Sequence, residues 1–433
     1  MRNLVMTMCF VVLFAGVASA VGGGPGGYVY YEAAYPHADS GGAIQYIEVY
    51  QLTLDNGWNV AAGPTALANI QFTDSNFASW SGATYGRGRL EVMDPRDQGG
   101  NGIVVVPTIW DDQPANGYGT DQPWHLATLD PSDLSQAKVM EGRIYQSGSN
   151  PNSENLYKFV PMPQDWYPGT TSNGLSFLVN SQFRVSYMHD ENGNGMIDNT
   201  TSEMQYVGSM DQAYDMEYAA GEDAIYYVDK NSSPTRYSID RCYLDGGNVW
   251  RQQLYFDVGG AGNPAADDQF GGYGLAVGPG ATPVVYYFAK DAAGLANIVA
   301  LRDTSGDNVI TIGVDTAVEI WASGDYGITL SGNYAEDLEL YINPDNGAMT
   351  LFGNGYYGVL FALELTDNGL QSVDGKVVLS DNTAWGLLKT GAGFELDMDP
   401  VGGTVIPEPG TMLLLGTAVL GAIGFVRRRR MQA

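Results

Sequence analysis

The sequence predicts an all-β fold for most of its 433 residues. Short runs rich in Val, Ile, Tyr and Phe recur along the chain, and each has the length of a β-strand. Gly, Asn, Asp and Pro separate the runs, as tight turns require, and no amphipathic helix of ordinary length is apparent. We therefore expect a body of on the order of twenty or more short strands.

The individual runs support this prediction one by one. Several alternate in polarity, which is typical of a strand with one buried face. Leu338, Leu340 and Ile342, for example, fall on the same face of their run. The clearest runs are 27–34, 44–54, 102–110, 182–190, 223–230, 248–258, 283–290, 297–303, 338–345 and 358–365.

A faint internal repeat narrows the choice among all-β folds. Segments 187–209 and 300–323 each contain a strand, an acidic loop and a second strand. Asp190 in the first segment aligns with Asp303 in the second, 113 residues later. This distance corresponds to two propeller blades of roughly 55 residues, or to one half of a duplicated domain.

Two further alignments extend the repeat. With three extra residues allowed, Glu203 aligns with Glu319, and further on Glu222-Asp223 aligns with Glu336-Asp337. Short strands, tight hairpins and a body of roughly 380 residues fit a β-propeller of six to eight blades. The alternative is a pair of stacked β-sandwich domains with a boundary near residues 259–274.

The N-terminus has the pattern of a secretory signal peptide. Arg2 precedes an apolar stretch from Val5 to Val17, and Ala18-Ser19-Ala20 supplies small residues for cleavage. We therefore assign residues 1–20 to a signal peptide and expect an exported mature chain.

The C-terminal segment 404–433 has the pattern of a membrane anchor. Thr411–Val426 is an uncharged run of 16 residues, which spans roughly 24 Å as a helix against a hydrocarbon core of about 30 Å. With Gly410 it predicts a single transmembrane helix over 410–426. Arginines after the span favour a cytoplasmic C-terminus, so the body 21–403 is expected outside.

Three parts of this tail stand in a fixed order: Pro407-Glu408-Pro409, the apolar run, and Arg427, Arg428, Arg429 and Arg430. Together they resemble the PEP-CTERM sorting signal of Gram-negative bacteria. The resemblance implies processing by an exosortase near Pro-Glu-Pro after an intermediate anchored in the inner membrane. It also implies delivery to the cell surface or extracellular matrix, with exopolysaccharide as a candidate partner. The body is loosely similar to the propeller-like repeats of such proteins.

The charge of the body excludes some partners. Leaving out Arg2, Arg427–Arg430 and Glu408 leaves 15 basic and 48 acidic residues, a net charge of −33. Such a surface repels nucleic acid and anionic membranes, so we expect no nucleic-acid partner. It suits divalent cations, or solubility alone.

Two acidic loops are candidate calcium sites, because calcium takes six to eight hard oxygens from alternate loop positions. In the first loop Gly195 supplies a sharp turn at position 6 of an EF-hand-type pattern. Position 12 is Thr201 instead of a glutamate, and Glu203 comes two residues late. The candidate ligands are Asp190, Asn192, Asn194 and Asp198.

The second loop offers Asp303, Ser305 and Asp307 at positions 1, 3 and 5. Asn308 stands at the glycine position, and Asp315 follows position 12. Both loops are also compatible with Asx-rich hairpin turns that bind no metal. If calcium binds, the missing twelfth ligand predicts weak affinity.

No catalytic residue is predicted. His189-Asp190 is more typical of the end of a strand than of an acid–base site, and Cys242 is more typical of a small buried residue than of a nucleophile. No nucleophile elbow is present, and among so many acids no carboxylate pair can be singled out. Trp124, Trp166 and Tyr167 are candidates for sugar-stacking platforms, but large aromatic residues more often close the ends of strands.

The function that fits these observations is that of an exported, non-enzymatic surface or matrix protein with a structural or adhesive role. One alternative is an extracellular carbohydrate-active enzyme, a hydrolase or lyase, built on a propeller. The other is a lectin-like carbohydrate-binding module.

Overall fold

The computed structural model describes residues 27–36, 44–55, 57–71, 91–93, 103–108, 124–130, 133–142, 156–172, 176–181, 184–193, 202–210, 213–232, 235–258, 270–332, 335–343, 346–355, 359–366, 368–379 and 397–400. Residues 27–399 form one compact unit. The signal peptide 1–20 and the anchor 404–433 lie outside the described residues.

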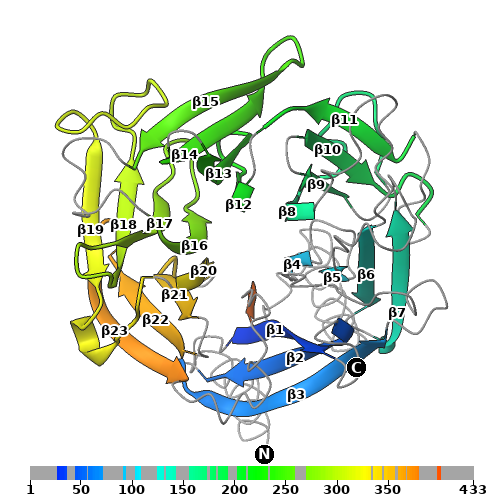
Figure 1. The fold of residues 1–433 in the computed structure, drawn as a ribbon, viewed down its shortest axis with the longest axis horizontal. Coiled ribbons are helices and arrows are strands. Elements are labelled where there is room, and N and C mark those ends of the chain that lie inside the picture. The colour runs from blue at the N-terminus through cyan, green and yellow to red at the C-terminus, as the bar shows by residue number, and fades with distance from the viewer. Residues whose placement is uncertain are drawn as a thin grey trace, which may run out of the picture. The chain divides into compact units, whose positions relative to one another are not determined.

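The strands of the described part of the body form six four-stranded units, here called sheets 1 to 6, of which the last two join into one eight-stranded sheet (Figure 1). Sheet 1 holds β24 (Asp397–Pro400), β1 (Gly27–Pro36), β2 (Ile44–Leu54) and β3 (Val60–Gln71). Sheet 2 holds β4 (Glu91–Met93), β5 (Ile103–Thr108), β6 (Trp124–Asp130) and β7 (Asp133–Gly142). Sheet 3 holds β8 (Leu156–Pro161), β9 (Ser176–Ser181), β10 (Arg184–His189) and β11 (Met204–Gly208).

Sheet 4 holds β12 (Ala213–Ala219), β13 (Ala224–Ser232), β14 (Thr235–Leu244) and β15 (Trp250–Asp257). Sheet 5 holds β16 (Phe270–Val277), β17 (Val285–Lys290), β18 (Ala296–Arg302) and β19 (Thr316–Ala322). Sheet 6 holds β20 (Ala335–Ile342), β21 (Met349–Gly355), β22 (Val359–Leu365) and β23 (Ser372–Leu379). Sheets 5 and 6 join through one parallel pairing, Gly272 with Ala335.

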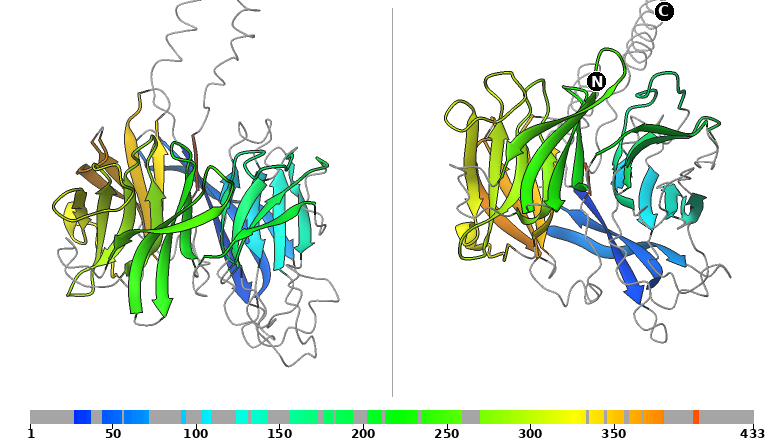
Figure 2. Two further views of the ribbon diagram at one scale, coloured as in Figure 1. Left: turned by 90° about the horizontal axis from the view of Figure 1, so that it is seen from above. Right: turned by 45° about the horizontal axis from the view of Figure 1, so that its top comes forward.

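From sheet 2 to sheet 6, consecutive sheets contact one another through their first strands. β12 contacts β8 on one side and β16 on the other, β4 contacts β8, and β16 pairs with β20. Successive four-stranded antiparallel units that meet in this way are the architecture of a β-propeller, and they confirm the predicted all-β, propeller-like body. Figure 2 shows the twist of the strands within individual sheets, most clearly in β12–β15.

Hydrophobic side chains at the interfaces between sheets form the core. One cluster lies between sheets 3 and 4, a second between sheets 4 and 5, and a third between sheets 5 and 6. Fully burying one large apolar side chain stabilises a fold by about 1.5–3 kcal/mol. Each interface buries many such side chains, so contacts between sheets hold the body together.

Contacts between the first and last sheets close the series. Trp58, in the turn between β2 and β3, packs its ring edge to face against Tyr341 and Phe352, with ring centroids 5.1 and 5.0 Å away. Lys376 on β23 donates to the backbone carbonyl of Gly57 at 2.7 Å and also to the side chain of Asn59. Sheet 1 itself pairs the C-terminal strand β24 with the N-terminal strand β1.

Each of the predicted strand runs overlaps an observed strand, and β2 covers the run 44–54 in full. The predicted sandwich boundary at 259–274 is wrong, because residues 270–277 form strand β16 inside the series of sheets. The glycines there permit close packing: a Cβ added at Gly274 would lie 2.6 Å from the backbone nitrogen of Leu338 on β20. Among the described residues the helical element is the single 3-10 turn η2 (Asp325–Gly327).

Within the described part of the chain, no helix combines the length and apolarity needed to cross a membrane. The predicted transmembrane helix 410–426 falls outside that part and stays a prediction.

The structure confirms one alignment of the repeat and corrects two. Asp190 and Asp303 each follow the third strand of a sheet, two sheets apart, as the spacing of two blades predicts. Glu203, however, directly precedes the fourth strand β11, and the residue in that position before β19 is Asp315 rather than Glu319.

The first strands correct the other alignment. Asp337 lies on β20, the first strand of sheet 6, and its counterpart on β12, the first strand of sheet 4, is Asp215 rather than Asp223. Asp215 and Asp337 each accept a hydrogen bond from the backbone N–H of the following residue, at 3.0 and 2.9 Å. The sequence alignment had matched a turn to a strand.

Candidate metal centre

The loop between β18 and β19 is organised from its first residue, Asp303. One carboxylate oxygen of Asp303 accepts a hydrogen bond from the backbone N–H of Gly306 at 2.7 Å, and the other accepts from the N–H of Asn308 at 2.6 Å. Gly306 and Asn308 adopt left-handed conformations, with φ of 80° and 61°. Asparagine tolerates this conformation better than most residues, so Asn308 serves as the turn residue where the pattern expected glycine.

Asp315 organises the same loop from its other end. Its Oδ1 accepts from the backbone N–H groups of Thr304 and Ser305, and its Oδ2 from that of Thr311, each at 2.9 Å. Burial alone would raise the pKa of Asp315, but these backbone donors lower it to about 2. Asp315 is therefore ionised at neutral pH.

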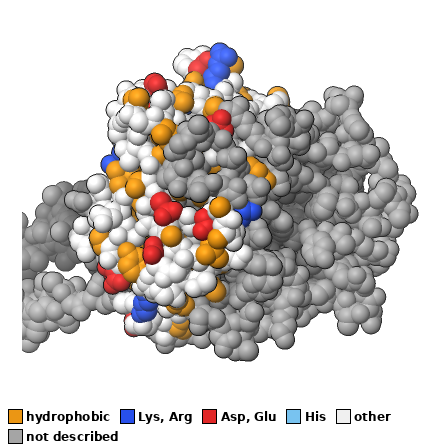
Figure 3. Space-filling model, turned by 60° about the vertical axis from the view of Figure 1, so that its left-hand side comes forward, with side chains coloured by type: hydrophobic (Ala, Val, Ile, Leu, Met, Phe, Trp, Pro, Cys, Tyr) orange, Lys and Arg blue, Asp and Glu red, His pale blue; other side chains and the backbone are white. Residues whose placement is uncertain are grey.

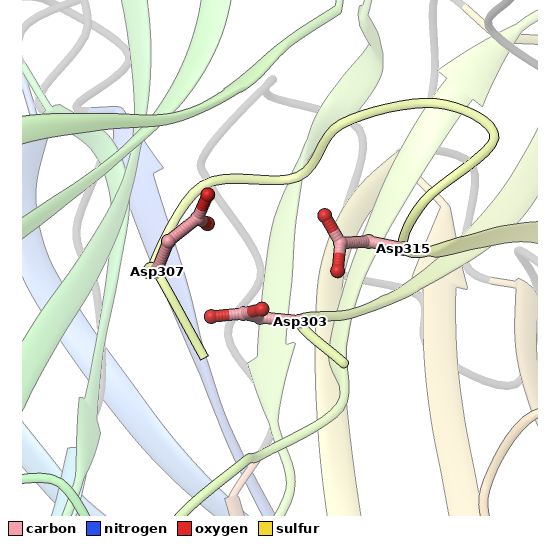
Figure 4. Close-up of side chains that lie close together, drawn as sticks. All are labelled: Asp303, Asp307 and Asp315. Carbon is pink, nitrogen blue, oxygen red and sulfur yellow. The ribbon is translucent and has the colours of Figure 1, made fainter. Parts of the chain in front are cut away.

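The loop brings three carboxylates together, from Asp303, Asp307 and Asp315 (Figure 4). One oxygen of each lies within 4.8 Å of the others. Calcium–oxygen distances are about 2.3–2.6 Å, so one calcium ion placed between oxygens that far apart could contact all three. Two of the predicted ligands, Asp303 and Asp307, belong to this group. The third, Ser305, donates its hydroxyl to Asp303 Oδ1 at 3.0 Å.

Sequence reasoning left Asp315 out of the candidate ligands. The loop positions were numbered by the twelve-residue loop of an EF-hand, in which the last ligand is a glutamate at position 12. Asp315 falls at position 13 of that numbering. Here the loop joins two antiparallel strands, and the residue that returns to Asp303 is the last one before β19. An acid one position beyond the expected place was the signal that could have identified it.

This loop also reaches the neighbouring sheet. Ile310 is 6% exposed and belongs to the core between sheets 4 and 5. Its backbone N–H donates to the carbonyl oxygen of Tyr255 on β15 at 2.7 Å. The side-chain amide of Gln253, also on β15, donates to the carbonyl oxygens of Asp307 and Asn308 at 3.4 and 3.2 Å. The loop therefore bridges sheets 5 and 4.

The first acidic loop, between β10 and β11, begins in the same way. Asp190 is fully buried, and its Oδ1 accepts from the backbone N–H of Gly193 at 2.7 Å. Glu203, at the far end, accepts from the backbone N–H of Glu191 at 3.2 Å and from the side chain of Asn192 at 3.1 Å. The structure thus brings Asn192 to Glu203, while the predicted ligands Asn194 and Asp198 lie outside the described residues.

Two other acids, the half-buried Glu222 and the exposed Asp223, accept hydrogen bonds from side chains of sheets 3 and 4 and their loops. Glu222 accepts from Arg241 Nε at 3.1 Å and from the hydroxyl of Tyr226 at 2.7 Å. Asp223 accepts from Trp166 Nε1 at 2.7 Å and from the hydroxyl of Tyr218 at 2.8 Å. Burial raises the pKa of the Tyr226 hydroxyl, and the neighbouring Tyr255 and Glu222 raise it further, so Tyr226 is a hydrogen-bond donor and not an activated nucleophile.

The predicted aromatic and nucleophilic candidates pack within the protein. Trp166 and Tyr167 are half-buried against Tyr187, with ring centroids 5.8 and 6.1 Å from it. His189 is buried and stacks on Tyr187 at 5.3 Å, and burial lowers its pKa. Cys242 is a free, buried thiol, as predicted. The side chain of the remaining candidate, Trp124, is not among those described.

The charge on the drawn face is dispersed. Figure 3 shows acidic side chains scattered among apolar and uncharged ones over the coloured part of this face. The loop 303–315 therefore stands out by the convergence of its carboxylates and not by a broad acidic patch.

Comparison with known proteins identifies the end of the chain. The family model of the PEP-CTERM protein-sorting motif matches residues 405–430, which include Pro407-Glu408-Pro409 and the four arginines of the predicted signal. No curated protein matches the chain.

Solved structures resemble the chain only remotely. A periplasmic gluconolactonase of Pseudomonas aeruginosa aligns with 81% of this chain and 83% of its own, at 11% identity and a TM-score of 0.35. Hydrazine synthase of Kuenenia stuttgartiensis aligns with 82% of this chain and 84% of its own, at 9% identity and a TM-score of 0.38. Likeness at this level says nothing about activity. What the sequence, the sheets and the matched motif establish together is a propeller-like all-β body that carries a C-terminal PEP-CTERM protein-sorting motif.

Proposed function

We propose that this exported, exosortase-sorted protein resides at the cell surface or in the extracellular matrix of a Gram-negative bacterium. There its body has a structural or adhesive role, with exopolysaccharide as partner. The observation that carries the proposal is the PEP-CTERM motif at residues 405–430, which begins shortly after the last described strand of the body ends at Pro400. The motif indicates export and sorting; the final location and the role are the proposed steps.

The chemistry of the described residues favours a non-enzymatic body. Glu222 and Asp223 are held by tyrosine, tryptophan and arginine donors, and Asp315 is held by backbone N–H groups. His189 is buried against Tyr187. Groups engaged in this way support the fold and are poorly placed to act as an acid, base or nucleophile on a bound sugar.

The sorting step can be tested by changing Pro407-Glu408-Pro409 to alanines in the native host. We expect the unchanged chain to pass through a membrane-bound stage and to appear at the surface in a shorter form. The variant should accumulate in the membrane at full length, and a chain ending at Gly403 should be released into the medium. Unaltered processing and location of the alanine variant would show that the tail is not read by an exosortase.

The role of the body can be tested with exopolysaccharide from the same host. We expect the surface-delivered protein to co-sediment with the polysaccharide without releasing new reducing ends. Release of reducing ends or unsaturated sugars would instead support a hydrolase or lyase. Binding of small oligosaccharides alone would support a lectin-like module.

We also propose that calcium binds weakly at the two acidic loops that begin at Asp190 and Asp303. Their first carboxylates accept a backbone N–H group in the same way, at 2.7 Å in both loops, and carboxylate oxygens are ligands that calcium takes. Affinity in the range of extracellular modules, on the order of 10⁻⁴ to 10⁻³ M, would allow partial occupancy outside the cell. The test is a melting curve of the full chain in mild detergent, first with chelator and then with millimolar calcium. An unchanged midpoint would leave both loops as metal-free hairpins.

A further inference from the structure

The turn between β2 and β3 is built like the turn between β14 and β15. Asp55 Oδ1 accepts the backbone N–H groups of the residues two and four positions later, at 2.9 and 2.8 Å. Asp245 Oδ1 accepts the same two groups of its own turn at 2.9 and 3.0 Å. The N–H of each aspartate donates to the carbonyl oxygen four positions later, at 2.8 and 3.0 Å. The two turns are therefore equivalent position by position.

The turns differ at the fourth position, which is Trp58 in one and Asn248 in the other. Both residues adopt the left-handed conformation, with φ of 56° and 61°. Asparagine tolerates this conformation, whereas a bulky aromatic residue in it is strained. A strained residue persists only where the surrounding structure holds it. The chemistry of the turn alone therefore does not account for a tryptophan at this position.

The ring of Trp58 lies against one face of sheet 6. It contacts the buried rings of Tyr341 on β20 and Phe352 on β21 edge to face. Tyr341 and Phe352 directly follow Leu340 and Leu351, which pack in the core between sheets 5 and 6. Because successive side chains of a strand point to opposite faces, the two aromatic rings lie on the face of sheet 6 away from sheet 5. Trp58 covers part of this second face.

A lysine on the same face holds the backbone of the turn. Lys376 on β23 is paired with Ala362 on β22, which is paired with Phe352, so the three side chains share a face. The ammonium group of Lys376 donates to the carbonyl oxygen of Gly57 at 2.7 Å and to Oδ1 of Asn59. The residues on either side of the tryptophan are thus bonded to β23, while its ring contacts β20 and β21.

From these observations we propose that residues 57–59, here called the latch, hold sheet 1 to sheet 6 and do so without the last strand, β24. The strand β24 joins sheet 1 by pairing with β1, and the latch contacts described above involve no residue of 397–400. All residues of these contacts lie at or before Lys376, so the latch can close as soon as sheet 6 has formed. The body is then closed in two steps, first by the latch and afterwards by β24.

The test is hydrogen exchange of the full chain in mild detergent, followed in peptides within 60–71 of sheet 1, 346–355 of sheet 6 and 213–219 of sheet 4. Trp58→Asn keeps a residue that suits the turn and removes the ring contacts. We expect about tenfold faster exchange in the first two peptides, as for losing two aromatic pairs, and no change in the third. If tryptophan served only the turn, asparagine would serve it equally well or better. Unchanged or slower exchange, or equal acceleration in all three peptides, would overturn the proposal.

Matched variants separate the ring from the turn. Trp58→Phe keeps an aromatic ring and should retain most of the protection that Trp58→Asn loses. Asn248→Gly changes the equivalent position of sheet 4 and should leave peptides 60–71 and 346–355 unchanged. Lys376→Met removes only the polar contacts and should accelerate these peptides less than Trp58→Asn does. Equal acceleration in Trp58→Phe and Trp58→Asn, or the same acceleration in Asn248→Gly, would show that the ring of Trp58 does not hold sheet 6.

A change in the last strand tests whether the latch acts alone. Met398→Pro, made in the full chain, removes a backbone N–H within β24 and disfavours its pairing. We expect faster exchange in the peptide 27–36 of β1 but continued protection of 346–355, and loss of both when Met398→Pro is combined with Trp58→Asn. If Met398→Pro alone accelerates exchange of 346–355 as much as the double variant, the latch does not hold without β24 and the proposal is wrong, whether or not the rest of the body opens too.

Discussion

The hairpins β14–β15 and β18–β19 connect equivalent strands of two sheets through loops of different length and structure. Each joins the third and fourth strands of its sheet. The first turns around a single carboxylate: Asp245 accepts from the N–H groups of Gly247 and Val249 at 2.9 and 3.0 Å and pairs with Arg251. The second runs from Asp303 to Asp315 and gathers three carboxylates.

The comparison shows that the longer loop contains more carboxylates than the closure of a hairpin requires. One aspartate suffices to close the short hairpin, and the turn between β2 and β3 uses Asp55 in the same way. In the long loop Asp303 and Asp315 already satisfy the turn N–H groups from both ends. Asp307 accepts one further N–H, that of Val309 at 3.0 Å, and adds a third carboxylate to the loop. The long loop also buries Ile310 against the next sheet, which the short hairpin does not do with its exposed Val249.

The largest loss of stability is expected when Ile310, the buried residue by which the long loop contacts sheet 4, is shortened. Ile310→Ala should lower the free energy of unfolding by about 2–5 kcal/mol, because it leaves a cavity in the core between sheets 4 and 5. The measurement is denaturant unfolding of the full chain. Ile312→Ala, at a residue of the same loop that is 41% exposed, is the control and should stay within about 0.5 kcal/mol. Equal losses in the two variants would mean that the loop does not hold sheet 4.

A smaller effect is expected from the acid that closes the long loop. Asp315→Ala leaves the backbone N–H groups of Thr304, Ser305 and Thr311 without their acceptor, and should cost about 1–3 kcal/mol in chelator. Asp245→Ala should cost less, since water can reach the donors of its exposed turn. Equal costs, measured by the same unfolding experiment, would show that both hairpins rely on their carboxylate to the same degree.

The smallest effect is one of pH. The pKa of Asp315 lies at about 2, below its usual value of 3.8, so its stabilising contribution is fully present above the usual value and is lost as pH falls toward the lowered one. Between about pH 4 and pH 2 the melting temperature of Asp315→Asn should therefore fall less steeply than that of the unchanged chain. Asp245 has a pKa lowered mainly by the backbone N–H of Val249, so Asp245→Asn provides the same comparison for the short hairpin. Parallel curves for the unchanged chain and Asp315→Asn would contradict the assignment.

Local patterns in the sequence were sufficient to predict the strands. Alternating or continuous apolar runs such as 44–54 and 283–290 carry their own evidence, and both became strands. The turn chemistry of Asp303 was also readable, because an aspartate followed by Gly or Asn positions at short range shapes its own loop.

Contacts between distant residues were not readable in the same way. The place of Asp315 depends on where β19 resumes pairing with β18, and the place of Tyr255 depends on the packing of one sheet on another. Trp58 looks like an ordinary turn residue until sheet 6 lies beside it. The glycine-rich segment that contains Gly274 suggested a domain boundary, because glycine has no side chain and so shows no alternation of polar and apolar residues. The structure shows that the same glycine lets β16 approach β20 closely.

The pairing of β24 with β1 also fixes an order of events in time. A chain exported from its N-terminus delivers β1, residues 27–36, before every other described strand, and β24, residues 397–400, after all of them. Sheet 1 therefore stays one strand short, with an unpaired edge, until nearly the whole body has crossed the membrane. The next residues to emerge are those of the sorting motif, from 405 onward. A cut near residues 407–409 would come only after the last piece of the body has arrived, and would leave that piece in place.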